Sequence, residues 1–264
     1  MGVLSRDLFD DEGRLLLSKN TKLTSQASSL LAKHGFTSSE INGFLQPDEK
    51  ILKALKRLKK RVNQQNSDVL STATDVLNRI LIESREKPWG MYCSVLANYN
   101  DWLYTHSINV SLLSLMIAIK INNSDTELWN IGLGALLHDV GKLLIPKSLI
   151  NRHGALNEHE FQIIKQHCEL GESALANYDL DPMCLEIVKQ HHERLDGSGY
   201  PDGLTGEQIA YGAKIVMISD SIDAMTSYRP YKNAYSIEEA MARLANDTDK
   251  YDEQLLLVAN ELLL

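Results

Sequence analysis

Features that mark secreted and nucleic-acid-binding proteins are scarce in this chain. Its 264 residues contain three cysteines, Cys93, Cys168 and Cys184, without a CxxC spacing. This odd count favours a reducing compartment and argues against structural zinc. Lys and Arg total 27 against 35 Asp and Glu, for a formal net charge of −8. General affinity for nucleic acid polymers or anionic membranes is therefore not expected.

Long apolar segments are also missing. The N-terminal sequence MGVLSRDLFDDEG lacks the apolar region of a secretory signal. The longest apolar run, residues 110–119, is about half of a membrane span. The composition, 44% hydrophobic and 23% charged, is that of an ordinary globular protein. We therefore expect a cytoplasmic protein without membrane insertion.

The first part of the chain, residues 1–46, is predicted to be a small α+β domain with a regulatory or assembly role. The apolar residues Val3 and Leu4, the turn DDEG at 10–13 and the run LLLS at 15–18 predict a hairpin. The segment TSQASSLLAKHG then predicts a short helix that ends at Gly35.

Residues 47–97 are predicted to be a helical linker followed by lead-in helices. Leu55, Val62, Val69 and Val76 repeat every seven residues, as in the seam of a dimer. The alternate seam positions hold Gln65, Thr72 and Arg79 instead of apolar residues. A homodimer through this linker and a helix packed on its own domain are therefore both open.

Residues 98–264 predict an all-α bundle, because helical patterns follow one another without a convincing alternating strand. One helix is expected to run from about residue 124 to Gly141, which would cap its C-terminus. Asn157 with Glu160 predicts a capping box. Asp181 followed by Pro182 predicts another helix start.

Seven chemically active side chains recur on the core-facing sides or at the ends of these helices: His106, His138, Asp139, His167, His191, His192 and Asp220. A single histidine on an apolar face is usually a hydrogen-bonded core residue. Five of them, accompanied by two aspartates, are too many for independent accidents. Helical bundles build dinuclear metal sites from such convergent side chains.

The ligand set of nitrogen and oxygen suits iron, manganese or zinc. Seven ligands are too many for one tetrahedral zinc, so we predict two divalent ions bridged by Asp139. Two ions roughly 3.5–4 Å apart clamp the attacking and leaving oxygens of an in-line displacement, which suits phosphoester hydrolysis. Lys142, Arg229 and Lys232 are cations that could hold phosphate oxygens, although an isolated Lys or Arg is more often a solvated surface residue.

Four segments, in this order, resemble the HD-GYP domain of bacterial signalling phosphodiesterases. They are THSINV at 105–110, HDVGKLLIP at 138–146, HHERLDGSGYPDGL at 191–204 and DSIDAMTSYRPYK at 220–232. The resemblance implies the helical HD-type fold. It also implies hydrolysis of cyclic di-GMP to linear pGpG, in some members on to GMP, with two metal ions that we expect to be iron or manganese.

The resemblance also implies roles for individual residues. The seven side chains above match the family's metal ligands, with Asp139 and Lys142 as the catalytic pair. Residues that match substrate contacts are Lys142, Tyr200, Arg229 and Lys232. Asp223 matches no metal ligand and is expected to support one, and glycines let the GYP loop turn sharply.

Some positions depart from the family pattern. Trp102 stands where some members carry a glutamate for a third metal, so two metals are expected; Asp101 would point about 100° away on a helix. Ala210 and Lys214 stand where proline and arginine are expected.

The intact GYP segment disfavours a phosphohydrolase of the HD superfamily that acts on mononucleotides, and two other functions remain open. One is a non-catalytic module that binds a cyclic dinucleotide or a protein partner. The other is a phosphodiesterase acting on cyclic GMP-AMP, because the sequence does not reveal the base preference.

Overall fold

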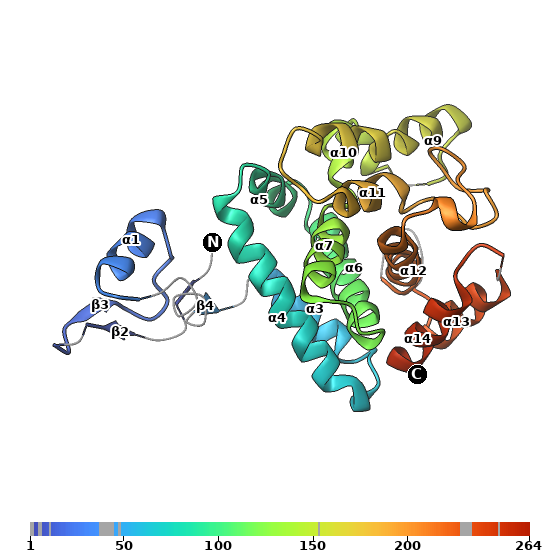
Figure 1. Cartoon of the computed structure of the whole chain (residues 1–264). Coiled ribbons are helices and arrows are strands. Elements are labelled where there is room, and N and C mark those ends of the chain that lie inside the picture. Colours follow the sequence, from blue (N-terminus) through green and yellow to red (C-terminus); the bar gives the residue numbers. More distant parts are fainter. Residues whose placement is uncertain are drawn as a thin grey trace. The chain divides into compact units, whose positions relative to one another are not determined.

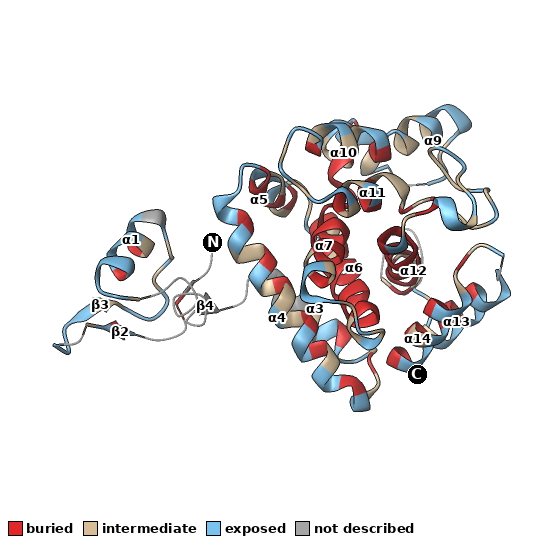
Figure 2. Ribbon diagram, viewed as in Figure 1, coloured by how far each residue is buried: buried red, intermediate tan, exposed pale blue. Residues whose placement is uncertain are grey.

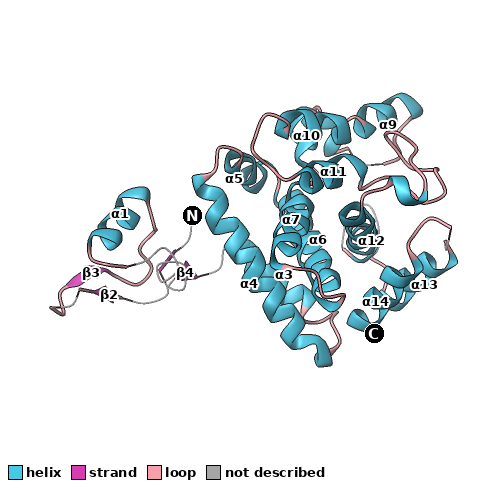
Figure 3. Ribbon diagram, in the orientation of Figure 1, coloured by secondary structure: helices cyan, strands magenta, loops and turns pink. Residues whose placement is uncertain are grey.

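The computed structural model describes residues 3–4, 7–10, 12–36, 45–46, 49–152, 154–227, 234–247 and 249–264. The chain divides into two compact units, Met1–Lys56 and Arg57–Leu264 (Figure 1). Helices account for most of the structure and the described strands are two or three residues long (Figure 3). The predicted fold class, mainly α with a small α+β N-terminal part, is confirmed. The three-part division at residues 46 and 97 stays a prediction.

The N-terminal unit combines two short antiparallel pairings with one helix. Strand β2 (Leu8–Phe9) pairs with β3 (Leu15–Leu17), and β1 (Val3–Leu4) pairs with β4 (Leu45–Gln46). The hairpin across DDEG is therefore confirmed, but its first strand is β2, whereas Val3 and Leu4 pair elsewhere. Helix α1 (Ser25–Lys33) begins at a Thr24 cap. Leu4, Leu8 and Leu31 form the core of this unit.

The charged linker is interrupted, so its seven-residue repeat does not run along a single helix. Helix α3 (Glu49–Leu58) ends before a turn and the short helix η1 (Gln64–Asn66), and α4 (Ser67–Glu83) follows. The buried face of α4 packs on α6 and α7 of the same chain. The heptad residues Val69 and Val76 lie beside this face and are only half-buried. Helix α4 thus packs on its own domain, and a homodimer stays a prediction.

The larger unit contains a sequence of helices around a buried centre. They are η2 (Ser84–Glu86), α5 (Gly90–Tyr99), α6 (Asp101–Lys120), α7 (Asp125–Leu137), η3 (Val140–Leu144), α8 (Lys147–Ile150), α9 (Glu158–Lys165), α10 (His167–Leu175), α11 (Pro182–Gln190), η4 (Gly206–Gln208), α12 (Tyr211–Thr226), α13 (Ile237–Asn246) and α14 (Glu253–Leu263). The predicted capping box at Asn157 and the start of α11 at Asp181–Pro182 are confirmed.

Helices α6, α7 and α12 form the centre, where burial is nearly continuous (Figure 2). Helix α6 packs against both α7 and α12, and α11 also contacts those two helices. By length and composition α6 could span a membrane, but 83% of its apolar window is buried inside the protein. Its apolar character is therefore explained by its place in the core.

Gly141 has a different role from the predicted one. Helix α7 ends at Leu137, and Gly141 lies in the following helix η3. A Cβ at Gly141 would overlap the backbone carbonyl of His167 and lie 2.7 Å from the backbone nitrogen of Gly171. The close approach of η3 to α10 requires glycine here, and it brings Asp139 near His167.

The Gly141→Ala substitution is expected to lower the free energy of unfolding by about 1–3 kcal/mol, because backbone atoms must separate to admit the methyl group. Gly132→Ala is the matched control, since its Cβ would meet only side-chain atoms, Ile80 Cδ1 at 2.7 Å and Leu115 Cδ2 at 3.0 Å. Urea unfolding measures both variants. Equal destabilisation by the two substitutions would contradict this account.

Candidate metal centre

Side chains from several helices converge in the interior of the larger unit. His106 comes from α6 and Asp220 from α12, whereas His138 and Asp139 follow the end of α7. His167 begins α10, and His191 and His192 follow the end of α11. The helices can be followed in Figure 1. His192 is half-buried, and the other six residues are buried. The structure thus brings all seven predicted residues together.

The seven side chains fall into two groups. In each group the possible ligand atoms lie within 4.8 Å of one another: Asp139, His167, His191 and His192 in one, His106, His138 and Asp220 in the other. The Asp139 carboxylate lies between them. Its Oδ1 is 3.4 Å from His167 Nε2, and its Oδ2 is 3.4 Å from His138 Nε2. One carboxylate oxygen therefore faces each group.

Three of the imidazoles are oriented in the same way, by a backbone carbonyl close to them in the sequence. Nδ1 of His138 is 2.7 Å from the Ala135 carbonyl, Nδ1 of His167 is 2.6 Å from that of Ile164, and Nδ1 of His191 is 2.9 Å from that of Val188. Each carbonyl belongs to the residue three positions earlier. A carbonyl only accepts, so Nδ1 carries the hydrogen and Nε2 carries the lone pair. Each Nε2 is therefore free to bind a metal.

His106 is oriented by a carboxylate instead. Its Nδ1 lies 2.7 Å from Asp223 Oδ2, and its Nε2 lies 3.1 Å from Asp220 Oδ1. Asn109 Nδ2 and Ser227 Oγ donate hydrogen bonds to Asp223 Oδ1. Burial lowers the pKa of His106, but its bonds to Asp220 and Asp223 outweigh burial and raise that pKa to about 9. Asp223 thus supports His106, as metal sites typically require.

Two buried polar atoms indicate what the arrangement can hold. His138 Nε2 and Asp139 Oδ1 have no hydrogen-bond partner among the described residues, and such buried atoms are costly to leave unpaired. Nε2 of His167 also faces Nε2 of His191 at 3.2 Å, where the tautomers above place two lone pairs. A divalent ion near each group would satisfy these atoms, so the residues fit metal binding.

The protonation states also fit. Burial lowers the pKa of His167 to about 4, and it lowers the pKa values of His191 and His192 well below their usual range. All three imidazoles are therefore neutral near pH 7. Burial raises the pKa of Cys168, whose Sγ lies 3.6 Å from His167 Nε2, so this neighbour is a thiol. The donor set is nitrogen and oxygen, as predicted.

Lys142 lies at the centre of the site. Its Nζ is 2.6 Å from Asp139 Oδ2, and its side chain is largely buried. Burial raises the pKa of Asp139, but the charge of the Lys142 ammonium group beside it lowers that pKa, and the pKa lies well below its usual range. The carboxylate is therefore ionised and available as a ligand.

The GYP loop closes beside the doubled histidine. The Tyr200 ring centroid lies 4.7 Å from that of His192, and Tyr200 N–H donates to the His192 carbonyl. A Cβ at Gly199 would overlap the backbone of Glu193. Gly197 and Gly203 have φ values of +77° and +65°, in the left-handed region that favours glycine. The glycines therefore allow the close turn that was predicted.

Three supporting residues were missed at the sequence level. Glu193 is fully buried, and its carboxylate accepts backbone N–H bonds from Asp202, Gly203 and Leu204. Its position beside the doubled histidine could have indicated a structural acid. Arg61, near Asp223, and Asn109 gave no such signal, because their contacts come from distant segments.

Some of the remaining residues were predicted to hold phosphate, and the others depart from the family pattern. Arg229 and Lys232 lie outside the described residues. Trp102 lies on α6, one turn before His106, and is half-buried. The departure from proline at Ala210 has a physical reason, because its backbone N–H donates to Gln190 Oε1 at 2.7 Å and proline has no N–H.

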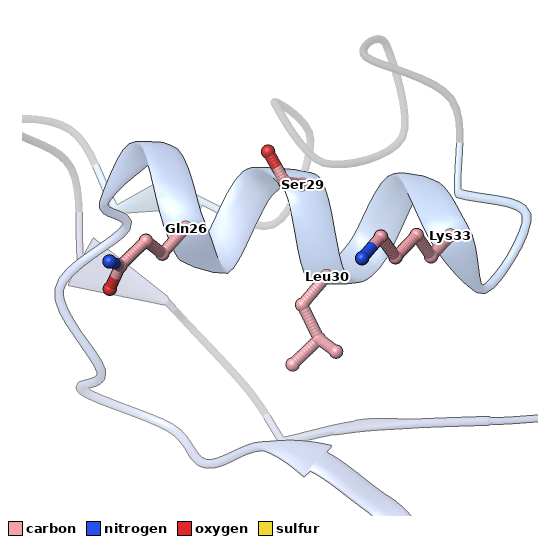
Figure 4. Close-up of a pocket in the computed structure, with 4 residues that line it drawn as sticks. All are labelled: Gln26, Ser29, Leu30 and Lys33. Carbon is pink, nitrogen blue, oxygen red and sulfur yellow. The ribbon is translucent and has the colours of Figure 1, made fainter.

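A hollow in the N-terminal unit lacks the ligand groups of the candidate metal centre. It lies along α1 and is lined by Gln26, Ser29, Leu30 and Lys33 (Figure 4). These residues share one side of the helix and include no pair of metal-ligating groups. The candidate site therefore remains in the larger unit.

Known proteins resemble this chain over the region of the site. It is 32% identical to a cyclic di-GMP phosphodiesterase of Pseudomonas aeruginosa, over 69% of this chain and 45% of that protein. It is 34% identical to a 3′3′-cGAMP-specific phosphodiesterase of Vibrio cholerae, over 52% of this chain and 30% of that protein. The chain thus spans less than half of each of these relatives.

A solved structure and a family description agree on the fold. A protein from Bdellovibrio bacteriovorus described as HDG"Y"P matches with a TM-score of 0.56 at 18% identity, over 97% of this chain and 92% of that one. Residues 91–255 match the family described as HD domain, which covers the metal centre and the GYP loop. The chain therefore belongs to the HD domain family, as its HD and GYP motifs indicated.

Proposed function

We propose that the protein is a metal-dependent phosphodiesterase that hydrolyses cyclic di-GMP to linear pGpG, with onward hydrolysis to GMP as a second step open to the same site. The observation that carries this proposal is the Asp139 carboxylate, which lies between two groups of buried histidines and aspartates. The similarity to proteins named cyclic di-GMP phosphodiesterases supports it.

Two divalent ions, iron or manganese, would be held by the seven side chains. His167, His191 and His192 would hold one ion, and His106, His138 and Asp220 the other, with Asp139 shared. When bound, such a pair supplies Lewis-acid polarisation of the phosphodiester and a nucleophile at neutral pH.

The chain's own residues bind and orient the substrate around this centre. The Lys142 ammonium lies 2.6 Å from Asp139 Oδ2, where it can balance the charge of a phosphate oxygen. Tyr200 lies against His192 and would border the nucleotide. Arg229 and Lys232 are assigned as further phosphate contacts on the family resemblance. In a chain of net charge −8, these cationic side chains would add to the attraction that the two divalent ions exert on an anionic substrate.

A second candidate is hydrolysis of cyclic GMP-AMP. The similarity to a 3′3′-cGAMP-specific phosphodiesterase favours it as the runner-up. Both substrates would present the same kind of phosphodiester to the metal centre. The ratio of kcat/KM for cyclic di-GMP to that for cyclic GMP-AMP therefore shows which of the two substrates the protein prefers. Binding of either without turnover would point to a signalling module instead.

The Asp139→Ala substitution is expected to abolish turnover and lower the metal content. It removes a carboxylate that lies 3.4 Å from a histidine in each group, so the loss should exceed the roughly 10–100-fold cost of removing an outer partner of a ligand. Metal analysis and cyclic di-GMP hydrolysis measure the effect. Asp179→Ala, at an exposed carboxylate of the same unit, is the control and should behave as wild type. Normal turnover in Asp139→Ala would refute the mechanism.

Metal binding to the stripped protein is expected to release about one proton at pH 7, because ligands must be deprotonated. The pKa of His106, about 9, lies above its ordinary value, so His106 is protonated in the metal-free protein. Manganese affinity should therefore rise with pH up to about 9. Protonated His106 also stabilises the metal-free protein. This contribution is complete at pH values below the pKa of His106 in the unfolded chain, and it is lost as the pH rises through about 9.

Calorimetry of manganese binding in buffers of different ionisation enthalpy counts the released protons. The Asp223→Asn variant removes the charge that faces His106 Nδ1, so its proton release should be smaller. Identical proton release in wild type and variant would contradict the role given to Asp223.

A further inference from the structure

A small cavity adjoins the metal centre on the side of the GYP loop. It is lined by Phe161, Lys165, His192, Arg194, Ser198, Gly199, Tyr200 and Lys250. Its volume is about 270 Å³, below the roughly 300–1,000 Å³ of sites that enclose a drug-sized ligand. His192 belongs to both the cavity and one group of metal-binding side chains. The cavity can therefore take one part of a ligand whose other part lies at the metal centre.

Three of the side chains that line this cavity carry rings: Phe161, Tyr200 and His192. The Phe161 and Tyr200 ring centroids are 6.2 Å apart with the planes at 80°, and Tyr200 also lies against His192. Phe161 is 40% exposed although it stands beside these rings. Aromatic side chains in this setting stack with nucleobases. Of the parts of a nucleotide, only the base can stack on these rings.

The cavity contains three cations, of which one is available. Arg194 donates to the Glu193 carbonyl and lies 5.1 Å from the Tyr251 ring centroid. Lys250 Nζ pairs with Asp247 at 3.1 Å. Lys165 Nζ lies 4.8 Å from the Phe161 centroid and 5.1 Å from that of Tyr200, and it has no carboxylate or carbonyl partner within the described part of the chain.

We propose that this cavity binds one base of the cyclic dinucleotide and that Lys165 selects guanine at that position. The inference rests on the proposed function for the identity of the ligand. Guanine offers two acceptors, O6 and N7, on one edge, and lysine is a frequent partner of that edge. Adenine replaces O6 with an amino donor, which an ammonium group cannot pair with. Because the planes of Phe161 and Tyr200 are at 80°, either base can stack on one ring and meet the other edge-on, and Lys165 is the group that distinguishes the two bases.

The test is calorimetric titration of the metal-loaded protein with GMP and with AMP. These ligands carry a phosphate and one base, and they contain no phosphodiester bridge that could be hydrolysed. GMP is expected to bind about 5- to 100-fold more tightly than AMP, the discrimination that one good base contact gives. Lys165→Met should bring the two affinities together, whereas Phe161→Ala should weaken both without changing their ratio.

Lys147→Met is the matched control. Lys147 Nζ lies 4.9 Å from the Tyr99 centroid, which is a similar lysine–aromatic contact outside the cavity, and its loss should leave the ratio unchanged. Equal binding of GMP and AMP by wild type, or an unchanged ratio in Lys165→Met, would overturn the proposal. A guanine preference without hydrolysis of cyclic di-GMP would uphold the cavity and refute the proposed enzyme. Hydrolysis of cyclic di-GMP without a preference for GMP over AMP would uphold the proposed enzyme and refute the role given to the cavity.

Discussion

The Asp139 carboxylate is the group on which the rest of the site depends. It is fully buried and faces histidines on both sides, 3.4 Å from His167 and 3.4 Å from His138. An ionised carboxylate in such a place needs cations, because burial alone is costly. Lys142 is one of them at 2.6 Å. Two divalent ions would be the others, and they give a physical reason for so many neutral imidazoles around one acid.

The fold serves this arrangement by simple means. Helices α7 and α11 end at the site, so the residues that follow them face the interior. Carbonyls three residues earlier orient His138, His167 and His191. The absence of a side chain at Gly141 lets η3 approach α10. Backbone geometry therefore orients much of the site. His106 is oriented by a carboxylate instead, because helix α6 continues past it and offers no free carbonyl.

The sequence was sufficient to predict that the seven side chains converge, because each lies on an apolar face or at the end of a helical pattern. It was less informative about what supports them. The contacts of Arg61 and Asn109 with Asp223 join segments far apart in the chain, and no periodicity reveals such contacts. Gly141 was misread as a helix cap because close backbone approach leaves the same signal, a glycine after a helix. The heptad pattern likewise missed the break that separates α3 from α4.

The proposed sharing of two metal ions by Asp139 in a phosphodiesterase is tested by anaerobic purification of the wild-type protein, metal analysis, and cyclic di-GMP turnover measured on the same sample. We expect about two iron or manganese ions per chain, the number that a two-metal site requires, together with linear product. A folded protein that contains no metal, or one that turns over cyclic di-GMP equally well after complete metal removal, would contradict this proposal.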